Sequence, residues 1–119
     1  MKKFFVLFLG VFLLSGCSNG KDNGLINYMD AKEKIINEGA VLVDVRTEDE
    51  YNADHISGAV LLTLDTINED TTKNVIASKD TPIIVYCRSG NRSSQALVKL
   101  EALGYTDVYD LGSIDNWEE

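Results

Sequence analysis

The residues best suited to chemistry in this 119-residue chain lie in the segment Cys87-Arg88-Ser89-Gly90-Asn91-Arg92. The four residues before it, Ile83 to Tyr86, are typical of a strand, and a helical pattern begins soon after it. The N–H groups of a strand-to-helix loop and the helix dipole bind anions, and such sites lower a thiol pKa from ~8.5 to ~3.5–7.5. Arg88 and Arg92 add positive charge. The pattern therefore predicts nucleophilic catalysis by a Cys87 thiolate.

The second cysteine, Cys17, ends a segment unlike the rest of the chain. Residues 1–3 are basic at Lys2 and Lys3, and Phe4–Leu14 is apolar except for Gly10. This run is shorter than the ~20 residues that span a bilayer, so residues 1–16 are predicted to be a signal peptide.

Leu14-Ser15-Gly16-Cys17 resembles the lipobox of bacterial lipoproteins. That resemblance implies that Cys17 becomes the first mature residue and carries acyl chains such as palmitate, which anchor the protein. We then expect residues 17–24 to hold the lipidated cysteine and a flexible tether, and residues 25–119 to form one domain on the extracytoplasmic face of the bacterial cell membrane. The alternative is an ordinary secretory signal. If Cys17 is lipidated, Cys87 has no disulfide partner within the chain.

The charge of the mature chain limits its partners. From residue 17 onward it has 9 Lys and Arg against 19 Asp and Glu, a net charge of −10. This balance argues against nucleic acid and against an anionic lipid surface as partners. An anionic ligand must therefore be attracted locally, by the residues of its own site.

The elements that must position Cys87 alternate between helix and strand. Asn27 and Asp30 indicate a helix through about Asn37, and Thr47 with Glu50 forms a capping box for a short helix. Strands are predicted at 40–45, 60–62, 83–87 and 107–109, one or two short helices at 65–77, and a helix from Ser93 or Ser94 to Gly104.

This alternation predicts an α/β fold with a parallel sheet covered on both faces. Ligand sites of such folds lie beyond the carboxyl ends of the strands. Cys87 stands at one of these ends, and Asp44 is close to another.

Three ordered motifs resemble the rhodanese-type sulfurtransferases. Residues 87–93 resemble the active-site loop, "LVDVRTEDEYNADHISGAVLL" at 42–62 resembles the upstream segment, and "LGSIDNW" at 111–117 resembles the C-terminal segment. Asp54, Ser57 and Ser113 depart from the usual pattern, and none lies in the cysteine loop. The resemblance implies a rhodanese-like three-layer fold, with a central, mostly parallel sheet and helices on both faces.

The resemblance also implies a mechanism. The Cys87 thiolate takes sulfur from thiosulfate or a persulfide, and a thiol, cyanide or a protein acceptor removes it. Residues Arg88, Ser89, Gly90, Asn91 and Arg92 would bind the anionic donor, and no cofactor is implied. Arg92 could instead turn inward and pair with Asp44, and the sequence leaves both roles open.

Two other functions remain as alternatives. A phosphatase with the Cys-x5-Arg motif is disfavoured, because only four residues separate Cys87 from Arg92. A sulfur-carrier or protein-interaction domain without turnover is compatible with the same loop.

The remaining candidates are interpreted as structural. His55, the only histidine, is expected to form hydrogen bonds in a turn, and Trp117 to pack at the C-terminus. Arg46 and Glu50 are expected to form a local ion pair. No Cys/His cluster is present in the sequence, so no metal site is predicted.

Overall fold

The computed structural model describes residues 24–118. The predicted signal peptide, Cys17 and the tether as far as Asn23 lie outside the described residues. Gly24, the last residue of the predicted tether, is buried beside Leu97. Within residues 24–118, no helix combines the length and the apolar character needed to cross a membrane.

A parallel sheet of four strands forms the centre of the fold. Its strands are β1 (Val41–Asp44), β2 (Val60–Leu61), β3 (Ile83–Cys87) and β4 (Val108–Ser113), in the order β2-β1-β3-β4. All pairs are parallel, so the carboxyl ends of the strands meet at one edge of the sheet. The strand that ends in Cys87 therefore lies beside the strand that ends in Asp44.

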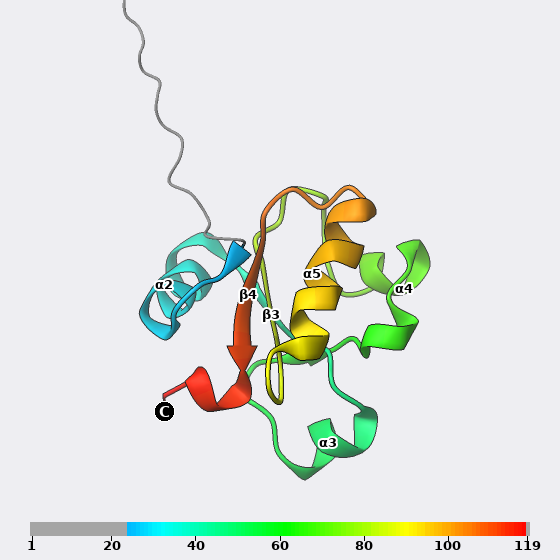
Figure 1. The fold of residues 1–119 in the computed structure, drawn as a ribbon. Helices are drawn as coiled ribbons and strands as arrows, with labels where there is room; N and C mark the ends of the chain where they lie inside the picture. The colour runs from blue at the N-terminus through cyan, green and yellow to red at the C-terminus, as the bar shows by residue number, and fades with distance from the viewer. Residues whose placement is uncertain (1–23, 119) are drawn as a thin grey trace, which may run out of the picture.

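Helices cover both faces of this sheet. In Figure 1, α2 (Tyr28–Glu38) and α5 (Asn91–Ala102) lie on opposite sides of β3 and β4, and α4 (Glu69–Lys73) lies on the α5 side. Along β3, Ile83, Val85 and Cys87 belong to the buried cluster that includes α5, whereas Ile84 and Tyr86 belong to the cluster that includes α2. These two cores confirm the predicted three-layer α/β fold.

Several predicted helix ends are confirmed. The Asn27 side chain accepts a hydrogen bond from the N–H of Asp30 at 2.8 Å, and α2 ends at Gly39, whose φ of 71° favours glycine. Thr47 and Glu50 form the expected capping box of α3 (Glu48–Ala53). Two short helices, Leu64–Thr66 and α4, occupy the segment where one or two were predicted.

The start of α5 differs from the prediction. The helix begins at Asn91 rather than at Ser93 or Ser94, because Gly90 reverses the chain with a φ of 101° and precedes the first turn. Arg92 and Ser93, the last two residues of the cysteine-loop motif, consequently belong to the first turn of α5.

The last strand is longer than the predicted 107–109, and it contains a bulge. Val85 pairs with Asp110 and Tyr86 with Gly112, so Leu111 is an extra residue in β4. The irregular register places Ser113 opposite Cys87. The C-terminal motif and the cysteine loop are therefore adjacent.

Candidate active site

Cys87 is the last residue of β3, and its side chain is buried. Its sulfur accepts hydrogen bonds from the N–H of Gly90 at 2.9 Å and from the N–H of Ser93 at 3.3 Å. Gly90 has no side chain to cap α5, and Ser93 is the third residue of that helix. The Cys87 sulfur thus occupies the place of an N-cap acceptor, where the helix dipole favours negative charge.

These contacts decide the ionisation of the thiol. Burial alone raises the pKa of Cys87, but the Ser93 hydroxyl and the N–H groups of Ser93, Gly90 and Ser89 outweigh burial, and the pKa lies below its ordinary value. Hydrogen bonds to the thiolate form stabilise it relative to the thiol. The site therefore favours the thiolate more than the surroundings of an unperturbed cysteine would.

Asp44 does not pair with Arg92. Its carboxylate accepts hydrogen bonds from Arg46 Nε at 3.0 Å and Nη2 at 2.8 Å, and from the Tyr86 hydroxyl at 2.8 Å. Arg46 is only 4% exposed, and its Nη2 also donates to the Asp54 carbonyl oxygen at 2.6 Å. This buried pair anchors the segment that follows β1, and it uses up the acceptors of Asp44.

Asp54 ends α3 in an extended conformation, with φ −173°. This position, one of the three that depart from the pattern of the resembled family, therefore requires no left-handed backbone in this chain.

Glu50 is the partner of Arg92. Arg92 Nη1 donates to Glu50 Oε1 at 2.7 Å, and Nη2 donates to Oε2 at 3.1 Å. Arg88 Nε lies 3.4 Å from the same Oε2. The predicted ion pair between Arg46 and Glu50 is therefore wrong: α3 lies beside the cysteine loop in space, so Glu50 contacts the two arginines that are distant in sequence.

The hydrogen bonds of Arg92 hold the pKa of Glu50 far below its usual range, with further bonds from Thr47. The same pairing raises the pKa of Arg92, although burial acts in the opposite direction. Glu50 and Arg92 are therefore both charged at neutral pH.

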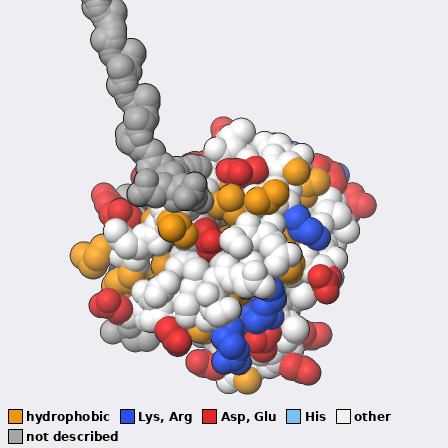
Figure 2. Space-filling model, in the orientation of Figure 1, with side chains coloured by type: hydrophobic (Ala, Val, Ile, Leu, Met, Phe, Trp, Pro, Cys, Tyr) orange, Lys and Arg blue, Asp and Glu red, His pale blue; other side chains and the backbone are white. Residues whose placement is uncertain are grey.

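The other predicted donor-binding residues surround the thiol at the surface. Ser89 and Asn91 are exposed, and the side chain of Arg88 is 68% exposed. Figure 2 shows Lys or Arg side chains gathered below the start of α5, with Asp and Glu side chains on the surface around them. The positive surface is thus local to this site, as expected for an anion site in a protein whose overall charge is negative.

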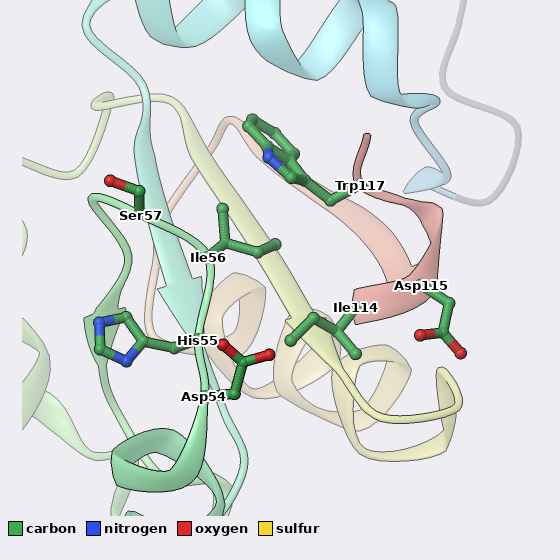
Figure 3. A pocket seen from close by; sticks show the side chains of 7 residues that line it. All are labelled: Asp54, His55, Ile56, Ser57, Ile114, Asp115 and Trp117. Carbon is green, nitrogen blue, oxygen red and sulfur yellow. The ribbon is translucent and has the colours of Figure 1, made fainter. Parts of the chain in front are cut away.

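A cavity of about 450 Å³ lies at the same edge of the sheet (Figure 3). Its lining consists of Asp54, His55, Ile56, Ser57, Ile114, Asp115 and Trp117. None of the residues of the cysteine loop contributes to it. The cavity is therefore separate from the thiol site, and its two carboxylates, Asp54 and Asp115, do not favour an anionic donor.

His55 and Trp117 make structural contacts. The Nδ1 atom of His55 lies 2.8 Å from the Tyr51 carbonyl oxygen, and the two rings stack with centroids 3.7 Å apart. Trp117 packs edge-on against Tyr28, with ring centroids 4.8 Å apart. Within the described part of the chain, no group of three or more His, Cys, Asp or Glu side chains is arranged to hold a metal ion.

Sequence reasoning missed the contacts of two residues at the candidate site, Ser93 and Glu50. Ser93 was placed in the loop motif and at a possible helix start but given no contact with Cys87, although a serine six residues after a cysteine can reach its sulfur across a tight turn. Glu50 was assigned to a local ion pair. Its helix follows β1, however, so it lies near the end of β3 when β1 and β3 are neighbours.

The similarity to known proteins covers most of the described fold. The family described as "Rhodanese-like domain" matches residues 28–119. The chain is similar to the thiosulfate sulfurtransferase GlpE of Coxiella burnetii, with 32% identity over 94 residues, which cover 78% of this chain and 85% of that protein.

Solved structures are also similar. The BH2092 protein of Bacillus halodurans has a TM-score of 0.69 and 34% identity, and the match covers 80% of this chain and 71% of that chain. A rhodanese from E. coli, solved with anions, has a TM-score of 0.59 and 31% identity over 65% of this chain and 89% of that one.

Proposed function

The chain belongs to the rhodanese-like domain family, and we propose that it is a sulfurtransferase that carries sulfane sulfur as a persulfide on Cys87. The observation that carries the proposal is the position of the Cys87 sulfur, which accepts two N–H bonds at the start of α5 and has a lowered pKa.

In the first step, the Cys87 thiolate attacks the outer sulfur of thiosulfate. A bond forms between the two sulfur atoms, the bond between the outer sulfur and the sulfonate sulfur breaks, and sulfite leaves with the electron pair. The persulfide keeps one negative charge, so charge and atoms balance. The loop N–H groups stabilise that charge without further reorganisation.

In the second step, an acceptor attacks the outer sulfur of the persulfide. Cyanide leaves as thiocyanate, or a thiolate leaves as a new persulfide, and the Cys87 thiolate is regenerated in a ping-pong cycle. No proton transfer is required when both thiols react as thiolates. The structural contacts of His55 are compatible with this chemistry, which needs no general base.

Steady-state turnover tests the proposal. Residues 18–119 retain every element of the described fold, and this form should convert thiosulfate and cyanide to thiocyanate with kinetics that depend on both substrates in the ping-pong pattern. If Cys87 takes up sulfur only from a partner protein and thiosulfate is not turned over, the chain is a carrier domain and the enzyme assignment is wrong.

We also propose that Cys17 carries the lipid anchor, on the resemblance of residues 14–17 to a lipobox. The full-length protein should partition into the detergent phase and with membranes. Cys17→Ala should remain unprocessed and should not incorporate a labelled fatty acid. Equal processing and equal lipid labelling of the two forms would contradict this proposal.

A further inference from the structure

One carboxylate, that of Glu50, contacts both Arg88 and Arg92 and offsets one of their two positive charges. Its Oε1 accepts from Arg92 Nη1 at 2.7 Å, and its Oε2 accepts from Arg92 Nη2 at 3.1 Å and from Arg88 Nε at 3.4 Å. Oε1 also accepts from the Thr47 N–H and hydroxyl, each at 3.0 Å. Glu50 is therefore fixed by its own helix and faces the arginines as a permanent counter-ion.

The contact between Glu50 and Arg92 is partly buried, so solvent and salt screen it less than they screen an exposed ion pair. The side chains of Glu50 and Arg92 are 20% and 30% exposed, and their two bonds form a bidentate pair. Arg46, the other arginine near the site, is buried and paired with Asp44. An anion at the loop therefore meets two positive charges from the arginines and one negative charge from Glu50.

We propose that Glu50 is a specificity residue that sets the charge of the sulfur donor. Because its carboxylate occupies both Nη groups of Arg92 and offsets one of the two arginine charges, the site favours a donor with one negative charge, such as a persulfide anion, over dianionic thiosulfate. This inference rests on the proposed function and names the substrate class of the same site.

Two donors that differ by one charge make the inference testable. Thiosulfate is a dianion, whereas methanethiosulfonate, in which a methyl group replaces one sulfonate oxygen, is a monoanion with the same transferable sulfur. The Cys87 thiolate attacks that sulfur in both cases, and the leaving group is sulfite from the first and methanesulfinate from the second. Both reactions leave the same persulfide on Cys87.

The variant Glu50→Gln removes the charge and retains the fold. Glutamine is accepted at the third helical position of a capping box, so α3 keeps its N-terminus. At separations of roughly 6–8 Å and an effective dielectric constant of roughly 40–80, one unit charge changes the affinity of another by about two- to tenfold. Removing the charge of Glu50 should therefore raise the affinity for the dianion by the square of this factor, and the affinity for the monoanion by the factor itself.

The measurement is the ratio of kcat/KM for thiosulfate to kcat/KM for methanethiosulfonate in the persulfide-forming half-reaction. In Glu50→Gln this ratio should rise about two- to tenfold, mainly through a lower KM for thiosulfate. Glu48→Gln provides the matched control, since it makes the same charge change on α3 at an exposed residue outside the arginine contacts. Its ratio should stay close to that of the wild type.

Three results would overturn the inference. An unchanged or lower ratio in Glu50→Gln would show that Glu50 orients the arginines for the donor and does not compete with it. An equal rise in Glu48→Gln would attribute the effect to the overall charge of the domain. If neither donor adds sulfur to Cys87 in the wild type, the proposed function itself fails, and the inference fails with it.

Discussion

At the scale of the residue, the Cys87 sulfur is both the predicted nucleophile and the acceptor that caps α5. The Ser93 hydroxyl is close to the thiol as well, and its oxygen lies 3.1 Å from the carbonyl oxygen of Gly90, to which it donates. A hydroxyl carries one proton, so a bond from the Ser93 hydroxyl to the Cys87 thiolate would replace its bond to Gly90. Ser93 thus contributes to the lowered pKa beyond the contribution of its N–H group.

The first prediction concerns this hydroxyl. In Ser93→Ala the N–H bond remains and the hydroxyl is lost, so the pKa of Cys87 should rise toward its ordinary value. The thiolate fraction falls as the pH drops through the thiol pKa. The pH profile of Cys87 alkylation by iodoacetamide should therefore shift to higher pH in the variant.

Ser94→Ala is the control for this prediction, because the exposed Ser94 hydroxyl donates to the Asn91 carbonyl oxygen. Its alkylation profile should match the wild type. Superimposed profiles for wild type and Ser93→Ala would show that the backbone N–H groups alone set the thiol pKa.

The sequence was informative about single residues where the chemistry is local, and less so where it depends on neighbours in space. Cys87 at a strand end, with its N–H donors, could be predicted from the strand pattern and the following helix. The partners of Arg46, Glu50 and Arg92 could not, because several pairings satisfy the same charges. Only the placement of α3 beside the loop selects between them.

At the scale of the element, Gly90 determines where α5 begins and therefore where the N–H groups point. Its φ of 101° lies in the left-handed region, and a Cβ there would meet only the Gly112 Cα, at 3.7 Å. The space is available, so the backbone conformation alone requires glycine.

The second prediction compares Gly90 with Gly39, which also has a positive φ and whose Cβ position meets nothing within 4 Å. Gly90→Ala and Gly39→Ala should each lower the free energy of unfolding by about 1–3 kcal/mol, because alanine is strained in this region. Urea denaturation measures this cost. Only Gly90→Ala should also slow persulfide formation, since it displaces an N–H that lies 2.9 Å from the sulfur. Equal rates in the two variants would mean that the cradle tolerates a shift of Gly90.

The sequence predicted correctly the start of each helix that has an ordinary capping residue. It was less accurate for the start of α5 and the extent of β4, which have no such residue or pattern. Asn27 and Thr47 are ordinary capping residues, and α2 and α3 begin where these side chains indicate. The start of α5 was placed two or three residues late, because its cap is a glycine and a sulfur atom rather than a serine side chain. The extension of β4 depends on the bulge at Leu111, for which the sequence gives no periodic signal.

At the scale of the whole molecule, the fold concentrates positive charge at one edge of an acidic protein. From residue 17 onward the chain has a net charge of −10, whereas Arg88 and Arg92 stand beside the thiol. The sequence predicted the layers and this imbalance, since both follow from composition and hydrophobic patterning. The strand order, which brings α3 to the site, depends on long-range pairing that the pattern leaves undetermined.

The third prediction follows from this imbalance. Salt screens distant charges first, because the Debye length is about 8 Å at physiological ionic strength. Added inert salt should therefore weaken the long-range repulsion of thiosulfate more than the local attraction, and kcat/KM should stay flat or rise slightly. Stopped-flow measurement of the donor half-reaction checks this. A steep fall with salt would show that the local positive charge dominates at long range.

The central claim is that Cys87 accepts the transferred sulfur, and intact-mass spectrometry tests it most directly. Residues 18–119 incubated with thiosulfate or methanethiosulfonate, and then freed of excess donor, should gain one sulfur atom. A thiol acceptor should then remove it. Cys87→Ser should gain none under the same conditions. Sulfur loading of the serine variant equal to that of the wild type, or no loading of the wild type by either donor, would contradict the account.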